Sequence, residues 1–338
     1  MKTDSLKLNW PLVGNSHIFE FFKKSLANKS IGGGYIFSGP TNVGKTTVAN
    51  YLAQSLICQS ARSTLPCGEC PACLQAKKGI HGDIYLIKKP ADKKNISITQ
   101  VRDFIRNLSM SSFLNSYKIG IIKGAEALSE GAVNALLKTL EEPKLNVIII
   151  LTANDFSVLP ETIVSRSQVL KFKPVAGDTI YDDLIKNHGA KRSQAKNFSR
   201  LAAGRPALAL KFLEDKAYFE DYKTKVKAFF EFLSPDLNRR LKVIEKVQGE
   251  KPAGQESIKS SEKIISIWKN LTRDLIFQEL GLNDLRQHQA FDEELMSKKN
   301  KFNLKSLINL AAALKRAGDY LNANVNSRLA LEDVAVNI

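Results

Sequence analysis

The fold is decided by the stretch Gly39-Pro40-Thr41-Asn42-Val43-Gly44-Lys45-Thr46, which matches the phosphate-binding pattern G-x-x-x-x-G-K-[ST] in full. A short apolar run at 35–38 leads into it, and an amphipathic segment at 45–57 follows it. Strand, loop and helix in this order place backbone N–H groups around phosphates at a helix N-terminus. The pattern predicts that Lys45 reaches the β- and γ-phosphates of a nucleotide and that the Thr46 hydroxyl binds Mg²⁺.

Short apolar runs and amphipathic segments alternate through the first half of the chain. The apolar runs lie at 83–87, 118–122 and 146–152, and helical periodicity occurs at 98–108 and 129–140. Because fully buried strands read as continuous apolar runs, this alternation is typical of a parallel sheet with helices on both faces. We therefore expect an α/β P-loop domain.

The second half of the chain has a different pattern, because every periodic segment beyond Pro174 is helical. We expect three domains: an α/β nucleotide-binding domain at 1–174, a small helical domain at 175–214 and an all-helical domain at 215–338. Helix-on-helix packing is the default use of an all-helical block of this size.

The apolar run 118–122 is followed by residues that do not suit nucleotide hydrolysis. A hydrolysing protein carries a metal-binding Asp and a water-activating Glu here, whereas this chain has Lys123 and Gly124. An ammonium group repels Mg²⁺, and glycine supplies no general base. Glu126 follows at the expected start of a helix, where an acid is favoured in any case, so its role stays open. The site is predicted to hold a triphosphate with little or no hydrolysis.

All four cysteines lie in one short stretch with the spacing C-x8-C-x2-C-x2-C. They are Cys58, Cys67, Cys70 and Cys73. Gly68 and Pro71 supply the turns that a knuckle needs, and four thiolates form a closed, structural zinc site. We expect a zinc knuckle at 58–73 inserted in the first domain. The alternative is a set of free thiols in a loop, since a disulfide framework is uncommon inside cells.

The chain has 338 residues, which is enough for about two or three domains. Its formal net charge of +16 favours a polyanionic partner such as nucleic acid over lysines that only solubilise the surface. No apolar run reaches the roughly 18–20 residues that span a bilayer, and the N-terminus has no signal-peptide pattern. We expect a cytoplasmic protein that does not contact a membrane.

Two further motifs are more specific than the phosphate loop. They are Leu136-Leu137-Lys138-Thr139-Leu140-Glu141-Glu142-Pro143 and Leu159-Pro160-Glu161-Thr162-Ile163-Val164-Ser165-Arg166-Ser167. With the phosphate loop, the cysteine knuckle, His81-Gly82-Asp83 and Asn134-Ala135-Leu136-Leu137, they closely resemble bacterial DNA polymerase III clamp-loader subunits of the AAA+ class. At the other end, Asn324-Val325-Asn326-Ser327-Arg328-Leu329-Ala330-Leu331-Glu332 resembles the C-terminal signature of the delta prime type.

The resemblance implies an assembly and a set of ligands. The domain at 175–214 would be the lid of an AAA+ protein, and the domain at 215–338 would be the collar through which related subunits form a ring. The implied partners are delta and tau/gamma subunits, the sliding clamp and primer-template DNA, within the DNA polymerase III holoenzyme. Zinc would be structural, and ATP with Mg²⁺ would bind without efficient hydrolysis.

The resemblance also implies roles for individual residues. Arg166 is similar to an arginine finger that acts on the nucleotide of a neighbouring subunit, because a guanidinium stabilises charge that builds up on a γ-phosphate. The alternative is an ordinary surface ion pair. Thr152 and Asn154 lie where similar proteins place a polar sensor, although they could simply cap a strand end. Arg205 is displaced from the usual second sensor, which makes a sensing role doubtful. The full predicted nucleotide set is Gly39, Asn42, Gly44, Lys45, Thr46, Thr47, Thr152 and Asn154.

Two alternative functions stay open. An active tau/gamma-like clamp-loader ATPase would share the knuckle and the intact loop, but Lys123, Gly124 and the delta prime signature oppose it. An independent zinc-dependent DNA-binding protein would need more basic residues near the knuckle than Arg62, Lys77 and Lys78. We therefore predict a delta prime-like ring subunit that is not itself a motor.

Overall fold

A computed structural model describes residues 6–60, 63–112, 117–249, 254–297, 302–323 and 325–337. Two units are distinguished by their internal packing. One comprises the chain up to Asp183 together with Gly204–Leu208, and the other comprises Leu184–Ala203 together with the chain from Ala209 onward.

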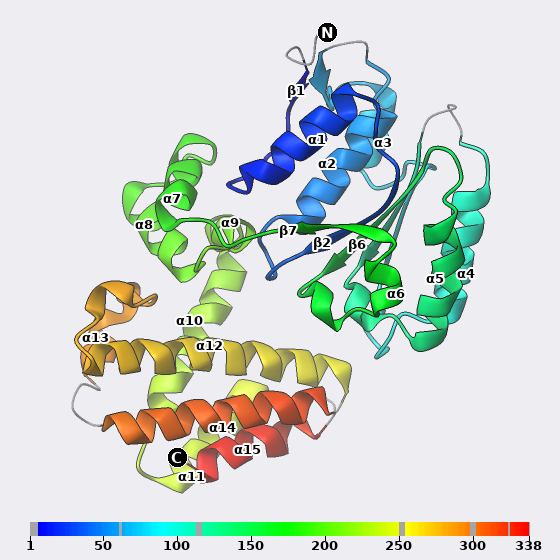
Figure 1. Ribbon diagram of the computed structural model, residues 1–338. Helices are drawn as coiled ribbons and strands as arrows, with labels where there is room; N and C mark the ends of the chain where they lie inside the picture. The colour runs from blue at the N-terminus through cyan, green and yellow to red at the C-terminus, as the bar shows by residue number, and fades with distance from the viewer. Residues whose placement is uncertain are drawn as a thin grey trace. The chain divides into compact units, whose positions relative to one another are not determined.

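The first unit is built on a five-stranded sheet whose paired strands are all parallel, in the order β4-β5-β6-β2-β7 (Figure 1). The strands are β2 (Gly33–Ser38), β4 (Ile84–Lys88), β5 (Lys118–Lys123), β6 (Val147–Ala153) and β7 (Ser167–Lys171). β2, the first strand of this sheet in the sequence, therefore lies between β6 and β7, the last two strands of the sheet in the sequence. Because the strands are parallel, the loops after β2, β5 and β6 meet at one edge, where P-loop proteins bind their ligands.

Helices cover both faces of this sheet. They are α1 (Ser16–Ala27), α2 (Lys45–Ile57), α4 (Ile98–Ser109), α5 (Glu130–Glu141) and the short α6 (Glu161–Val164). Phe37 of β2 packs in one core with α1 and α2, whereas the adjacent Ile36 packs in a second core with α4, α5 and α6. This alternation follows from the two-residue period of a strand. At Gly120 a Cβ atom would lie 2.2 Å from Phe104 Cζ, so glycine makes room for this ring.

The N-terminal segment is attached to the cysteine knuckle. Strand β1 (Lys7–Leu8) pairs in parallel with β3 (Thr64–Leu65), which lies between the first two cysteines. The indole of Trp10 is buried and donates a hydrogen bond of 3.0 Å to Ser55 Oγ of α2. A short helix, α3 (Pro71–Lys77), completes the knuckle. The knuckle is thus part of the first unit and not a separate module.

The described residues of the second unit form helices joined by loops and contain no β-strand (Figure 1). Its helices include α8 (Arg192–Leu201), α10 (Lys216–Phe232), α11 (Leu237–Gln248), α12 (Gln255–Glu279), α13 (Asp292–Met296), α14 (Leu304–Asn322) and α15 (Ser327–Val336). Trp268 of α12 is fully buried, with its ring centroid 4.5 Å from that of Phe232. Two more helices, α7 (Gly177–Lys186) and α9 (Pro206–Glu214), cross the division between the units.

A buried polar network links elements of the second unit. Asp274 Oδ2 of α12 accepts hydrogen bonds from the backbone N–H groups of Gln287 (2.9 Å) and His288 (2.7 Å), and it lies 2.7 Å from His288 Nδ1. The other ring nitrogen of His288 lies 2.7 Å from the hydroxyl of Tyr222 on α10. Burial acts to raise the pKa of Asp274, but the hydrogen bonds from His288 and Gln287 hold this pKa below its usual value.

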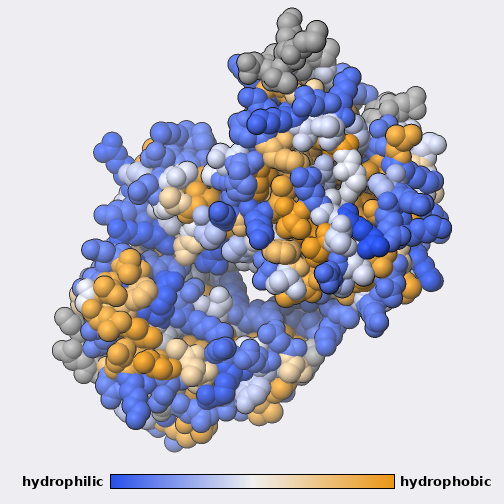
Figure 2. Space-filling view, viewed as in Figure 1, coloured by the Kyte–Doolittle hydropathy of each residue, from blue (hydrophilic) through white to orange (hydrophobic). Residues whose placement is uncertain are grey.

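The second unit also exposes a group of apolar side chains around α13. Its members are Leu280, Leu282, Leu285 and Met296, and Figure 2 shows an orange area over this part of the surface. Single exposed apolar side chains are ordinary, whereas a group within one segment is less so. No described helix combines the length and the apolar character needed to cross a membrane.

These observations confirm the expected fold class, an α/β P-loop domain with a parallel sheet covered on both faces and a helical C-terminal part. Strand β7 was not predicted, because Ser167-Gln168-Val169-Leu170-Lys171 has no continuous apolar run. The division at 174/175 and 214/215 stays a prediction. Within the resemblance to the delta prime signature, Asn324 lies outside the described residues.

Candidate nucleotide and metal sites

A cavity of about 560 Å³ lies at the edge of the sheet where β2, β5 and β6 end. Seven of the eight predicted nucleotide-site residues line it, namely Asn42, Gly44, Lys45, Thr46, Thr47, Thr152 and Asn154. Its wall is completed by Thr41, Lys123, Gly124, Glu126, Ala153 and Ala207. The structure thus gathers residues from four separate segments into one site with the size and polarity of a small-ligand pocket.

Gly39, the remaining predicted residue, does not line the cavity but packs closely against the segment after β7. Its φ is +151°, and a Cβ atom there would lie 2.2 Å from the carbonyl oxygen of Phe172, which follows β7. Gly44 has a φ of +103° immediately before α2. Both backbone conformations favour glycine. Glycine is therefore favoured at Gly39 by the close approach of Phe172 and at Gly44 by the positive φ before α2.

The phosphate loop is also tied to a segment distant in sequence. The carbonyl oxygen of Asn42 accepts a hydrogen bond of 3.1 Å from the backbone N–H of Ala207, which belongs to the Gly204–Leu208 part of the first unit. Ala207 lines the cavity, whereas Arg205 is not among the lining residues described there. The sequence analysis considered Arg205 in this region, but the residue that contacts the phosphate loop is Ala207.

Lys45 is buried and turned toward its own loop. Its ammonium group donates hydrogen bonds to the carbonyl oxygens of Gly39 and of Pro40, the latter at 2.7 Å. Burial lowers the pKa of Lys45 to about 8, and the negative charge of Glu126 acts in the opposite direction. A triphosphate would offer this cation stronger acceptors than two carbonyl groups.

The end of β5 forms part of the cavity wall. Lys123 and Gly124 both line it. Gly124 has a φ of +75°, and its N–H lies 3.2 Å from the Thr152 hydroxyl oxygen, which accepts the hydrogen bond. Thr152 therefore keeps its own proton for donation to a ligand. The backbone turn at Gly124 brings Glu126, in the short 3-10 helix η1 (Ala125–Ala127), to the cavity wall.

The four predicted metal ligands come together in the knuckle. The Sγ atoms of the four cysteines all lie within 4.8 Å of one another, and those of Cys67 and Cys73 are 3.9 Å apart. A zinc tetrahedron with Zn–S distances of about 2.3 Å separates its sulfur atoms by about 3.8 Å. The cysteines are not joined by disulfides. The geometry therefore fits a tetrahedral thiolate metal site.

Backbone N–H groups point at the cysteine sulfur atoms. The N–H of Cys67 donates to Cys58 Sγ at 3.5 Å, and the N–H groups of Cys70 and Cys73 donate to Cys67 Sγ and Cys70 Sγ at 3.4 Å each. Burial raises the pKa of the Cys58 and Cys73 thiols. Hydrogen bonds from Glu69 and Cys70 lower the pKa of Cys67 to about 6. A metal cation at the centre would favour the thiolate form of all four residues.

Arg166 lies outside the nucleotide cavity of its own chain, between α6 and β7. Its Nε donates to Glu141 Oε1 at 2.6 Å, and its Nη2 lies 2.5 Å from the same oxygen. The two side chains are 35% and 46% exposed. The ion pair that was weighed against the finger interpretation is therefore present, and the guanidinium remains accessible from solvent.

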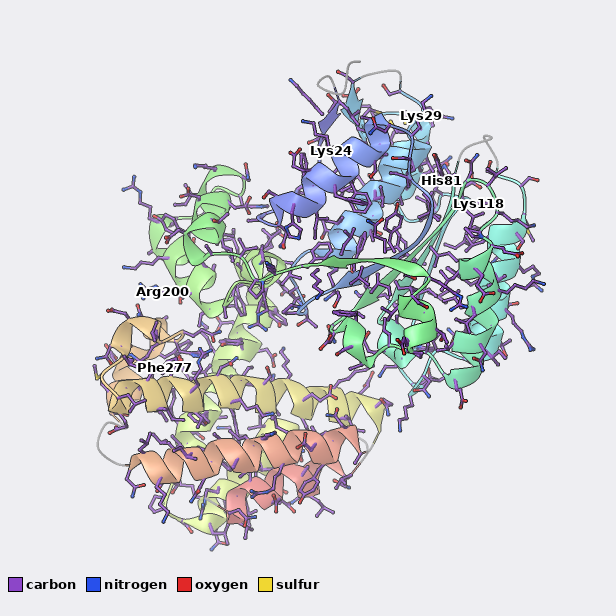
Figure 3. All side chains as sticks on the ribbon, in the orientation of Figure 1. Lys24, Lys29, His81, Lys118, Arg200 and Phe277 are labelled. Carbon is purple, nitrogen blue, oxygen red and sulfur yellow. The ribbon has the colours of Figure 1, made fainter. Side chains whose placement is uncertain are left out.

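A buried ion pair joins the starts of β4 and β5 and includes Asp83 of the motif His81-Gly82-Asp83. Lys118 Nζ lies 2.9 Å from Asp83 Oδ1, with both side chains almost completely buried. His81, labelled next to Lys118 in Figure 3, accepts a hydrogen bond from the Asp83 N–H through Nδ1 at 3.1 Å. Burial lowers the pKa of His81, which keeps this imidazole neutral. The ion pair thus lies at the opposite end of β5 from Lys123, which lines the nucleotide cavity.

The chain is similar to several known proteins. The family model described as "DNA polymerase III, delta subunit" matches residues 14–176. DNA polymerase III subunit delta' of Haemophilus influenzae is 29% identical over 223 residues, covering 66% of this chain and 66% of that protein. Subunit delta' of Pseudomonas aeruginosa is 36% identical over 132 residues, covering 39% of this chain and 40% of the relative.

Subunits of the tau type match as well. DNA polymerase III subunit tau of Bacillus subtilis is 34% identical over 188 residues, covering 56% of this chain but 33% of the relative. The chain thus spans about a third of the length of this tau relative and about two thirds of the length of the Haemophilus influenzae delta' relative. These matches show that the chain is similar to DNA polymerase III subunits of the delta' and tau types.

Proposed function

We propose that this chain is a delta prime-like subunit of the DNA polymerase III clamp loader, and that it is a stator rather than a motor. The observation that carries the proposal is the composition of the nucleotide cavity. The phosphate loop is intact, but Lys123 and Gly124 stand at the wall where hydrolysis needs a metal-binding and a water-activating acid. Such a cavity can hold ATP through Lys45, Thr46 and the loop N–H groups without turning it over at a useful rate.

Zinc is the metal we propose for the knuckle. Four thiolate ligands leave no open coordination position, which suits a structural ion and not a catalytic one. When bound, zinc would hold Cys58 at the end of α2 against Cys70 and Cys73 at the start of α3. It would thereby also fix β3, which pairs with the N-terminal strand β1.

Arg166 is the residue we propose to act on a neighbouring subunit. Its accessibility and its position outside the cavity of its own chain support an action in trans. A guanidinium at a foreign γ-phosphate stabilises the charge that develops during phosphoryl transfer, and such fingers contribute about 10³- to 10⁵-fold in rate. The proposed partners are delta and tau/gamma subunits in one hetero-oligomeric ring, with the sliding clamp and primer-template DNA reached through the complex.

The test is the Arg166→Ala variant in a complex reconstituted with the other clamp-loader subunits. We expect assembly to be retained, because Arg166 is half-exposed, and DNA-stimulated ATP hydrolysis to fall by at least about tenfold. Arg106→Ala is the matched control, since Arg106 forms an exposed ion pair with Asp103 at 2.9 Å on α4. Unchanged hydrolysis in the Arg166 variant would contradict the assignment.

A tau/gamma-like active ATPase is the second candidate. The similarity to subunit tau of Bacillus subtilis and the presence of Glu126 in the cavity favour it. Steady-state hydrolysis by the isolated chain separates the two functions, with Lys45→Ala as the control that removes the phosphate-binding cation. Rapid turnover that is lost in the control would establish the motor and reject the stator.

A further inference from the structure

The motif Leu140-Glu141-Glu142-Pro143 has no part in the function proposed so far, yet one of its acids contacts Arg166. Glu141 is the last residue of α5, and Arg166 follows α6. Glu141 Oε1 accepts from both Nε (2.6 Å) and Nη2 (2.5 Å) of the guanidinium. This oxygen therefore occupies one whole edge of the group that we propose to act on a neighbouring nucleotide.

The opposite side of the guanidinium is also held. Nη1 donates to the carbonyl oxygen of Thr162 at 3.0 Å and lies 3.3 Å from Ser165 Oγ. An arginine side chain has five N–H donors, and these contacts engage Nε and both terminal nitrogens. A bidentate contact with a phosphate needs two adjacent N–H groups on one edge. The Nε–Nη2 edge of Arg166 can make such a contact only when Glu141 leaves it.

We propose that Glu141 is a positioning residue for Arg166, and that it is the resting partner which the γ-phosphate of the neighbouring subunit displaces. This inference rests on the proposed action of Arg166 in trans. The carboxylate keeps the guanidinium close to α6 while the neighbouring site is empty. A triphosphate carries more negative charge than Glu141 and takes over the Nε–Nη2 edge when it binds.

The energetics suit a contact that must be exchangeable. Both side chains are roughly a third to a half exposed, and exposed ion pairs stabilise only weakly because water and salt screen them. A fully buried pair would hold the arginine too strongly, since breaking it would leave an unpaired buried charge. The carbonyl of Thr162 can remain bound throughout, because it faces Nη1 and not the edge that Glu141 occupies.

Glu141→Gln tests the inference in the reconstituted complex. The amide keeps the shape of the side chain and removes the charge that competes with the phosphate. We expect the ATP concentration for half-maximal DNA-stimulated hydrolysis to fall by about two- to fivefold, with the maximal rate unchanged. Glu142→Gln is the matched control: it removes the same charge from the next, exposed residue, and we expect no change.

A double variant distinguishes positioning from a merely structural effect. The double variant Arg166→Ala with Glu141→Gln should hydrolyse ATP at the same rate as Arg166→Ala alone, because Glu141 acts through Arg166. An unchanged or higher half-maximal ATP concentration in Glu141→Gln alone would overturn the inference while leaving the finger in place. If Arg166→Ala itself has no effect, it is the proposed function that fails.

Discussion

The phosphate loop and the cysteine knuckle are both short motifs of the first unit that lead into a helix, but their sites are assembled differently. Each uses a glycine with positive φ, Gly44 at +103° before α2 and Gly68 at +77° before α3. The knuckle brings all four of its ligands within 4.8 Å of one another. The loop holds Lys45 against its own carbonyl groups, and a second lysine, Lys123, lines the cavity.

The difference follows from where each site takes its residues. The knuckle draws its ligands from the single stretch 58–73, so local geometry suffices to build it. The nucleotide cavity needs the ends of β5 and β6 and the segment around Ala207. A site assembled from distant segments can lose one function and keep another, because each segment contributes separately. The two sites should therefore respond very differently to single changes.

The largest expected effect is on the knuckle. Cys73 is almost fully buried, and Cys73→Ser removes one of four thiolate ligands. We expect bound zinc to be lost, together with much of an apparent metal-binding free energy that is roughly 10 kcal/mol or more in small zinc domains. Metal analysis and limited proteolysis of the segment 58–80 measure this. The wild-type protein treated with a chelator and then resupplied with zinc is the control.

A knuckle that keeps full zinc occupancy and protease resistance without Cys73 would not be a four-thiolate site. If chelation also abolished nucleotide binding, the independence of the two sites would be wrong.

The second largest expected effect is a pH dependence of ATP affinity that arises from Lys45. Burial lowers the pKa of Lys45 to about 8, so the free protein loses this proton as pH rises through 8. A triphosphate requires the charged form, and binding above pH 8 must therefore take up a proton. We expect ATP affinity to fall about tenfold between pH 7 and pH 9. Titration calorimetry in buffers of different ionisation enthalpy measures the affinity and the proton uptake together.

Lys45→Ala is the control for this pH dependence. Its affinity should be low at both pH values and nearly independent of pH in this range. A wild-type affinity that stays constant from pH 7 to pH 9 would mean that Lys45 does not contact the phosphates.

Much of this comparison could be predicted from the sequence. The phosphate loop and the cysteines were identified from spacing, because both motifs are local. The central strands were visible as apolar runs. Strand β7 was not, because an edge strand that pairs only with β2 needs no continuous apolar run. Its only apolar residues are Val169 and Leu170, which pack against the two different cores.

What the sequence could not give is the pairing of side chains across segments. Arg166 and Glu141 lie in motifs that were both recognised, but their ion pair depends on how α5 and α6 lie together. The place of Glu126 likewise depends on the turn at Gly124, whose φ of +75° sends the chain back toward the cavity. Such contacts are properties of the tertiary structure, and periodicity carries no information about them.

The smallest expected effect tests whether an acid at position 123 is enough for the cavity to bind Mg²⁺ together with ATP. Lys123→Asp replaces a cation on the cavity wall with an oxygen ligand for Mg²⁺. It also removes an attraction for the phosphates, so affinity for ATP without magnesium should fall. We expect the ratio of ATP affinities with and without Mg²⁺ to rise by about three- to tenfold. Binding titrations in magnesium and in a chelator measure this ratio.

Lys88→Asp is the matched control for this change. Lys88 is the register partner of Lys123 on the adjacent strand β4 and is not among the residues lining the cavity, so the ratio should stay unchanged. Turnover should remain negligible in Lys123→Asp, because Gly124 offers no base and its left-handed backbone disfavours an acid at that position. Hydrolysis that appears in Lys123→Asp and disappears when Glu126→Gln is added would assign the base to Glu126. In that case the cavity lacks one carboxylate instead of two, and the stator differs from a motor by a single side chain.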